Sequence, residues 1–252
     1  MRVSLIFAFA LLLTVFSSCS KDEVAQIEST PSSCLNSSGV EGLYWDISNG
    51  IPRGDIPGGV PTIANPGGTF FHPSQPILGF QYPAGWTPVT LSDPVNATIG
   101  VNLFRNDNQA IYRFLSFTVP GILTVNDVFN FEKSGMEATF GLGNTNEVCS
   151  NSGSDNSFGV FISGRSALLE GSGQKAIINV NVTHVPGLNS SFVNVQVTSA
   201  PSNQYETEVL ETFLPIGWQM LYRPSGDTFL SDRDGDGVID IDDADPDDPN
   251  VQ

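Results

Sequence analysis

Aspartate side chains recur at fixed spacings near the end of the chain. Counting from Asp232, carboxylates stand at positions 1, 3, 5, 9 and 12, and Gly237 stands at position 6. A calcium ion takes about six to eight oxygen ligands, alternating carboxylates can point inward at it, and a glycine at position 6 permits the sharp turn. Without a cation, the same carboxylates repel one another. The spacing therefore predicts a calcium-binding loop, and a solvated acidic tail is the alternative.

The complete segment, SDRDGDGVIDIDDADPDDPN, resembles a thrombospondin type 3 repeat. Its second half matches the continuation of that pattern, although the usual cysteine is absent and position 12 is Asp rather than the Glu of an EF-hand. Pro246 and Pro249 block the leaving helix that an EF-hand has. The resemblance implies calcium as the cofactor. It assigns one ion to Asp232, Asp234, Asp236, the carbonyl of Val238 and Asp243, and a shared second ion to Asp240, Asp243 and Asp245.

The N-terminal segment predicts export across a membrane. An apolar run extends from Val3 to Phe16, which is too short for a stable membrane span, and Ser17, Ser18 and Cys19 follow it. This ending resembles the lipobox of bacterial lipoproteins, in which the cysteine is lipidated and becomes the mature N-terminus. The resemblance implies attachment to a membrane through a lipid on Cys19. An ordinary cleavable signal with an incidental cysteine is the alternative.

The residues after Cys19 bear on the final location. Ser20, Lys21, Asp22 and Glu23 resemble the export signal that sends some Gram-negative lipoproteins to the outer face of the outer membrane, and a plain solvated tether is the alternative. We therefore expect an outer-membrane lipoprotein and leave open whether it is exposed on the cell surface. The expected organisation is a signal peptide at 1–18, a tether at 19–39, a single domain at 40–226 and the acidic repeat at 227–252.

Composition limits the chemistry further. The formal net charge is −17 and no basic cluster occurs, so nucleic acid is not an expected partner. With Cys19 lipidated, Cys34 and Cys149 are the remaining thiols, and we expect a disulfide between them in an oxidising compartment. Two thiols and two histidines, His72 and His184, are too few ligands for us to expect a zinc or other transition-metal centre.

The elements that would position any site are mostly short. Residues 42–85 are dense in Gly and Pro and predict turns with short extended pieces, and residues 141–157 predict a polar loop that carries Cys149. Alternating apolar residues predict strands, with a hairpin turn at 105–108. The expected strands are 80–82, 97–104, 110–119, 159–162, 176–184 and 191–198.

Two helices are expected. Thr124 followed by Asp127 predicts an N-cap, and Gly135 is a candidate end of that helix. Ser202 is the expected cap of a second helix, whose apolar stripe runs from Tyr205 to Leu214 before Pro215 ends or bends it.

This order of elements resembles the PsbP-like fold over residues 78–222, where Tyr82-Pro83-Ala84-Gly85-Trp86 matches a phrase on the first strand of that family. The resemblance implies an α+β fold in which helices flank an antiparallel sheet. Its members are generally regarded as binding or assembly factors. An all-β sandwich is the alternative fold.

We identify no catalytic residue in the sequence. No Gly-x-Ser-x-Gly elbow occurs, His184 is expected to face solvent and His72 to lie in a loop. The three tryptophans, Trp45, Trp86 and Trp218, fit core packing better than a sugar-stacking platform. We therefore expect a binding or assembly module for an unknown protein or glycan ligand. A surface hydrolase or glycan-degradation accessory is the alternative, if scattered acids meet in the fold: Asp46, Asp93, Asp127 and Glu170.

The calcium loop leads to a direct test. Carboxylates crowded into a compact loop repel by about 1 kcal/mol per pair, so the tail should become compact only when calcium binds. We expect heat in calorimetry and protection from protease when millimolar calcium is added to the mature chain, and little of either with magnesium. Asp236→Ala should weaken both signals. Protection that is absent, or that Asp236→Ala leaves unchanged, would support the solvated tail instead.

Overall fold

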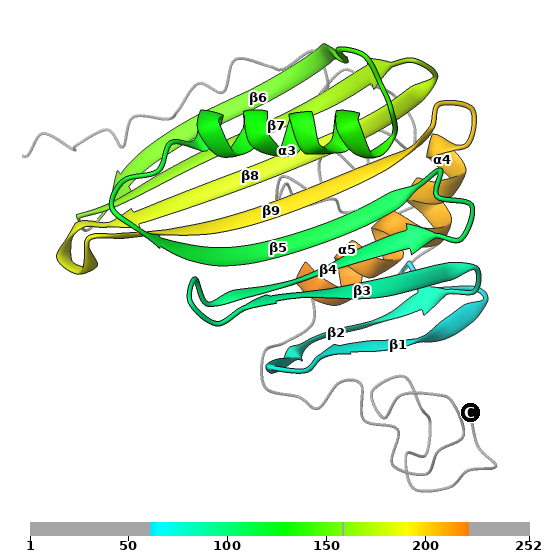
Figure 1. Cartoon of the computed structure of the whole chain (residues 1–252), viewed down its shortest axis with the longest axis horizontal. Coiled ribbons are helices and arrows are strands. Elements are labelled where there is room, and N and C mark those ends of the chain that lie inside the picture. The colour runs from blue at the N-terminus through cyan, green and yellow to red at the C-terminus, as the bar shows by residue number, and fades with distance from the viewer. Residues whose placement is uncertain (1–60, 158, 222–252) are drawn as a thin grey trace, which may run out of the picture. The chain divides into compact units, whose positions relative to one another are not determined.

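The computed structural model describes residues 61–157 and 159–221, shown in colour in Figure 1. All of them belong to one unit of the chain, Pro31–Gln252. The predicted signal peptide, the tether with Cys19 and Cys34, and the calcium repeat lie outside the described residues. The expectations for these segments therefore stay predictions.

Most described residues belong to antiparallel strands. Seven strands form the main sheet in the order β3-β4-β5-β9-β8-β7-β6, and two others form a separate hairpin (Figure 1). The hairpin pairs β1 (Pro66–His72) with β2 (Gln75–Pro83). The main sheet contains β3 (Trp86–Asp93), β4 (Thr98–Arg105), β5 (Ile111–Pro120), β6 (Asn146–Ser157), β7 (Val160–Gly171), β8 (Gln174–Val185) and β9 (Ser190–Pro201).

The central strands pair without a register shift. β9 pairs with β5 on one side and with β8 on the other, along the whole length of each shared segment. Because side chains alternate along a strand, Val193, Val195 and Val197 all point to one face of the sheet. These valines belong to the first core, and Ile177 and Ala200 belong to the second core, on the other face. The sheet therefore divides the apolar residues between two cores.

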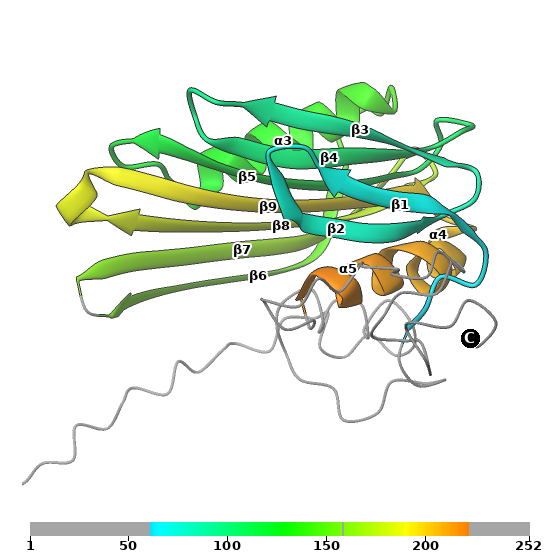
Figure 2. The same ribbon diagram turned by 90° about the horizontal axis from the view of Figure 1, so that it is seen from below.

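Helices lie on opposite faces of the sheet. The helix α3 (Val125–Thr139) packs on β7 and β8 and buries Val128, Phe129 and Met136 in the first core (Figure 1). A second helical segment lies on the opposite face, as the view turned by 90° shows (Figure 2). That segment is built from α4 (Tyr205–Glu208), the π-helical turn η3 (Val209–Phe213) and α5 (Leu214–Leu221). None of the helices in the described part has the length and apolar character needed to cross a bilayer.

The start of α3 follows the sequence signal, but its end does not. Thr124 is the N-cap, and its hydroxyl accepts a hydrogen bond from the backbone amide of Asp127, as predicted. The predicted end at Gly135 is wrong, because the helix continues to Thr139. A single glycine inside a helix costs only about 1 kcal/mol, which the buried face of α3 offsets.

The C-terminal helical segment begins later than predicted and contains an irregular turn. Its cap is Gln204 rather than Ser202, and no side chain caps it. The π-helical turn ends at Phe213, two residues before Pro215. Proline has no amide hydrogen to donate to the preceding turn, and a wider turn accommodates that loss. Pro215 does not end the segment, because α5 continues to Leu221.

The predicted fold class is wrong. A mostly β structure, with a seven-stranded antiparallel sheet and a small two-stranded one, replaces the expected α+β PsbP-like sandwich. The all-β sandwich is closer in strand content, but helices and a short hairpin cover the main sheet where a sandwich would have a second large sheet.

Two segments contain more strand than predicted. Residues 146–157, expected in a polar loop, are the edge strand β6, which pairs with β7. In the Gly- and Pro-dense segment, where short extended pieces and a strand at 80–82 were expected, residues 66–72 and 75–83 form β1 and β2. Cross-strand backbone hydrogen bonds do not depend on side-chain polarity, and an edge strand can expose polar side chains on both faces. Residues 146–157 therefore carry no apolar alternation from which a strand could be predicted.

Candidate functional site

A cavity of about 180 Å³ lies between α3 and the strands β4 and β5. Apolar side chains from the sheet and from the helix make up most of its wall. Its position follows from the topology, because α3 packs on β7 and β8 and leaves the same face of β4 and β5 beside it (Figure 1). The apolar lining residues are Phe104, Ile111, Phe131, Met136, Phe140 and Val197.

One ion pair supplies the polar part of the wall. Arg113 donates to both carboxylate oxygens of Glu132, from Nε at 3.0 Å and from Nη2 at 3.3 Å. Its Nη1 donates to Oδ1 of Asn102 at 2.8 Å. Arg113 and Asn102 are cross-strand partners on β5 and β4, and Glu132 reaches them from α3. The guanidinium is thus held by two elements at once.

The charges of this pair cancel within the cavity. The Glu132 side chain is 7% exposed and the Arg113 side chain 20% exposed, so neither charge is well hydrated. A buried charge is tolerated when a partner and hydrogen bonds compensate for lost hydration, and here each charge has both. The wall therefore offers an apolar surface and amide or guanidinium edges, but no uncompensated charge. Such a lining suits an apolar group better than an ion.

The rim of the cavity carries exposed apolar surface. The Phe131 side chain is 73% exposed although it lines the cavity, and Val89 on the neighbouring strand β3 is 46% exposed. Gly135 also lines the cavity, and a Cβ built there meets no atom within 4 Å. The cavity thus opens to solvent beside an unburied aromatic ring. Single exposed apolar residues are common, but a cluster at a hollow is a candidate interaction site.

Polar contacts fix α3 on the sheet. Glu137 accepts hydrogen bonds from the backbone amide and hydroxyl of Thr145, both at 2.7 Å, and pairs with Lys133 at 3.1 Å. Burial alone would raise the pKa of Glu137, but these contacts together lower it. The stabilisation they give is therefore present at neutral pH and is lost as the pH falls through the lowered pKa. The Arg165 guanidinium lies 4.0 Å from the centre of the Phe129 ring and holds the same helix to β7.

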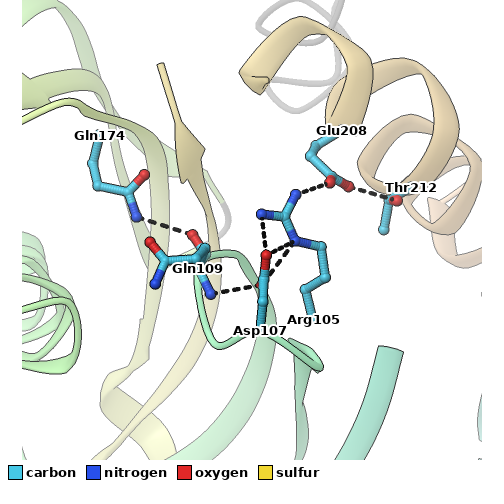
Figure 3. A network of polar contacts seen from close by, with 6 residues as sticks. All are labelled: Arg105, Asp107, Gln109, Gln174, Glu208 and Thr212. Carbon is cyan, nitrogen blue, oxygen red and sulfur yellow. Dashed lines mark hydrogen bonds and ion pairs between the residues drawn. The ribbon is translucent and has the colours of Figure 1, made fainter. Parts of the chain in front are cut away.

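A second charged network joins the turn after β4 to the C-terminal helices (Figure 3). Arg105 binds Asp107 through Nε and Nη2 and binds Glu208 through Nη1, and Thr212 donates to the other oxygen of Glu208 at 3.0 Å. The hydrogen bond from Arg105 lowers the pKa of Asp107, and the reciprocal contacts raise the pKa of Arg105 against the effect of its burial. Every charge here has a partner, so we interpret the network as structural.

The two histidines differ from their predictions. His184, expected to face solvent, is buried, and its Nδ1 lies 3.3 Å from the hydroxyl of Ser191. It shares a face with Val182, since residues two apart in a strand point the same way. Ser191 donates to the carbonyl of Gly121 and accepts from the amide of Leu123. The serine proton is therefore committed to a carbonyl, and the pair is not an activated nucleophile.

His72 ends the strand β1 and is fully buried, so its predicted loop position is wrong as well. Its Nε2 hydrogen-bonds the carbonyl of Leu91 at 2.9 Å, which joins the β1–β2 hairpin to the main sheet. Trp86 is buried and packs edge-on against Phe213, with 6.1 Å between the ring centres, which confirms its core role. Trp218 is half-buried, and Trp45 lies outside the described residues.

Three of the four acids that could have formed a hydrolytic site have local partners, and the fourth, Asp46, lies outside the described residues. Asp93 accepts from the amide of Val95, Asp127 from the hydroxyl of Thr124, and Glu170 pairs with Lys175. None of these contacts brings two carboxylates together. Within residues 61–157 and 159–221, no group of three or more His, Cys, Asp or Glu side chains is placed to hold a metal. The predicted calcium ligands, from Asp232 to Asp245, lie outside these residues.

Cys149 is buried on β6 and is disulfide-bonded. The other cysteines of the chain, Cys19 and Cys34, lie outside the described residues. The pairing of Cys34 with Cys149 therefore remains a prediction.

The cavity has no counterpart among the sites predicted from the sequence. Its charged pair joins residues 19 positions apart in different elements, which no local motif marks. A signal was present in Phe131, which stands off the buried stripe formed by Val128, Phe129, Glu132 and Met136. An aromatic residue on the polar side of a helix could have been singled out as a candidate contact.

Comparisons with known proteins add little. The chain matches no protein-family model and no curated protein. Among solved structures, it is similar to one titled "Crystal structure of LpqN involved in cell envelope biogenesis of Mycobacterium tuberculosis", with 11% sequence identity over 52% of this chain and 77% of that chain. The TM-score of 0.28 is too low for this likeness to bear on the fold or the function.

The Arg113–Glu132 pair can be tested by a double-variant cycle. Arg113→Met leaves the Glu132 carboxylate buried without its cation, and we expect the free energy of unfolding to fall by about 3 kcal/mol in urea denaturation. Adding Glu132→Leu removes the stranded charge and should recover a large part of that loss. If the double variant is no more stable than Arg113→Met, the cavity wall depends on the arginine alone.

Proposed function

We propose that this chain is a lipid-anchored protein of the cell envelope, a binding or assembly module that takes an apolar group of a partner protein into the cavity beside α3. The supporting observation is the cavity itself, with six apolar side chains in its wall, a neutralised ion pair and an exposed ring at its mouth. The export and lipidation signals at 1–23 support the envelope location.

The size of the cavity favours a side chain as its occupant. Pockets for whole small molecules usually measure about 300 to 1,000 Å³. The cavity beside α3 measures about 180 Å³, which suits one apolar side chain presented by a larger partner. An aromatic or aliphatic anchor seated in such a hollow supplies much of the binding energy at many protein interfaces. Phe131 would pack around the anchor from the rim.

The remaining parts of the proposal rest on the sequence. Lipid at Cys19 would hold the domain at the outer membrane, either inside or at the cell surface, and the tail at 227–252 would bind calcium. The alternative, a surface hydrolase or an accessory of glycan degradation, needs facing carboxylates. Asp93, Asp127 and Glu170 have local partners instead. We therefore favour a binding module over an enzyme.

In-cell photocrosslinking tests this proposal. A photoreactive phenylalanine at position 131 of the full lipoprotein should give a discrete adduct with a partner protein. The same group at position 138, an exposed residue of α3 that does not line the cavity, should not. Gly135→Leu should abolish the adduct, because the new side chain fills open space at the cavity.

The Gly135→Leu variant carries its own control for folding. Leucine replaces a glycine in a helix interior at a position without a clash, so thermal stability should rise slightly. An adduct at 131 that survives Gly135→Leu, or an equal adduct at 138, would contradict cavity binding. Absence of any adduct from either position in intact cells would count against the proposal too.

A further inference from the structure

Four carboxamide side chains gather on the face of the sheet opposite α3. Asn179 and Asn181 lie on β8, and Asn194 and Gln196 lie on β9. The strand register places Asn179 directly opposite Gln196, and Asn181 directly opposite Asn194. Cross-strand partners are about 5 Å apart, so the four side chains form one continuous patch. Together with Tyr112, Phe114 and Met220 they line a hollow of about 100 Å³.

The hollow contains no charged side chain. Its hydrogen-bonding groups are carboxamides and one phenol, in a chain whose formal net charge is −17. Each carboxamide offers both an acceptor oxygen and two donor hydrogens. Sugar hydroxyls likewise donate and accept, so they match this mixture better than a phosphate or a carboxylate does. An anion would find no cation in the hollow, and a cation would find no carboxylate.

Existing contacts hold part of this patch in place. Asn181 donates to Oδ1 of Asn179 at 3.1 Å, and Gln196 donates to the hydroxyl of Tyr112 at 3.0 Å. Tyr112 donates in turn to the sulfur of Met220 on α5. Burial raises the pKa of Tyr112, so the phenol stays protonated. Three of the four carboxamides, Asn179, Asn181 and Gln196, are thus oriented before any ligand arrives, which reduces the entropy lost on binding.

The neighbouring strand leaves room for one of these groups. Gly164 on β7 is the cross-strand partner of Asn181, and a Cβ at position 164 would lie 2.9 Å from Oδ1 of Asn181. The Asn181 carboxamide therefore lies over the glycine. Asn181 and Asn194 are both exposed, and Asn194 makes no side-chain hydrogen bond within the described residues. Hydrogen-bonding capacity is available here for a ligand.

An aromatic ring borders the patch. Phe192 lies two residues before Asn194 on β9, so it points to the same face, and its side chain is 38% exposed. An exposed ring beside fixed hydrogen-bonding groups offers an apolar surface on which one face of a pyranose can stack. The combination selects a ligand with an apolar face and many neutral hydroxyls.

We propose that this surface, formed by Asn181, Asn194, Gln196 and Phe192 over Gly164, binds a neutral oligosaccharide. The site lies on the opposite face of the sheet from the cavity beside α3, so it does not depend on the proposed partner site. The chain then has two binding surfaces, one for a protein side chain and one for a neutral glycan. Such a protein can hold a partner at an envelope or extracellular polysaccharide.

Titration calorimetry of the mature chain with hexasaccharides tests the site. The panel contains neutral oligomers of glucose, mannose and N-acetylglucosamine, and an oligogalacturonate as the anionic comparison. We expect at least one neutral oligomer to bind and the anionic one not to bind. Asn194→Ala should weaken the affinity by about tenfold or more, since it removes two donors and an acceptor.

A matched pair of glycine variants separates the site from the fold. Gly164→Ala displaces the Asn181 carboxamide and should weaken binding with little change in melting temperature, because the clash is with the end of a flexible side chain. Gly143→Ala, where a Cβ meets nothing within 4 Å, should leave the affinity unchanged. Gly135→Leu, on the other face, should also leave it unchanged.

No binding to any neutral oligomer would overturn the proposal. Binding that survives both Asn194→Ala and Gly164→Ala would overturn it equally, because the sugar would then sit elsewhere. If Gly135→Leu alone abolishes sugar binding, the glycan occupies the cavity beside α3 and both proposals are wrong. Loss of the photocrosslinked partner with sugar binding intact would leave the glycan site standing by itself.

Discussion

The register between β8 and β9 is the constraint on which the described structure depends. These two strands pair along their full length without a bulge, and β9 continues the same pairing with β5. A slip of one residue would turn every side chain of a strand to the other face. Valines of the first core would then meet the C-terminal helices, and the carboxamides would be buried under α3. The register is therefore maintained because both cores need apolar side chains on their own face of the sheet.

The two faces that result have different chemistry. On one face, α3 packs on β7 and β8 but does not cover β4 and β5. The cavity forms at the side of the helix, above these uncovered strands. A neutral ion pair completes that wall, so the hollow stays apolar without an uncompensated charge. On the other face, apolar residues occur under the helices and the hairpin, whereas asparagines replace them further along β8 and β9. Each candidate site thus marks a place where a covering element stops.

Local signals in the sequence predicted local structure. The cap at Thr124 and the turn between β4 and β5 are confirmed, because each depends on residues close together in the chain. Burial at Ile178, Val180 and Val182 also follows the predicted alternation. The other face of β8 is polar from Asn179 on, yet Asn179 is buried there. Which faces are covered depends on distant elements, and no alternation pattern contains that information.

Features made by distant residues could not be predicted. The edge strand β6 consists of polar residues that pair with β7 through the backbone, and nothing in its composition distinguishes it from a loop. The cavity residues come from β4, β5, β9 and α3, and the patch of carboxamides becomes visible only when β8 and β9 are set in register. In the sequence, Asn179 and Asn181 indicate only the polar side of a strand. Their partners, Gln196 and Asn194, lie more than a dozen residues away.

Amide hydrogen exchange tests the central role of this register most directly. If β8 and β9 organise both cores, the amides of Ile177–Val182 and Val193–Thr198 should exchange only through global unfolding and be the slowest in the domain. Amides of the edge strand β6 and of β3 should exchange earlier, through local opening. Edge-strand amides that exchange as slowly as those of β8 and β9, or central amides that exchange as fast as the edges, would contradict the account.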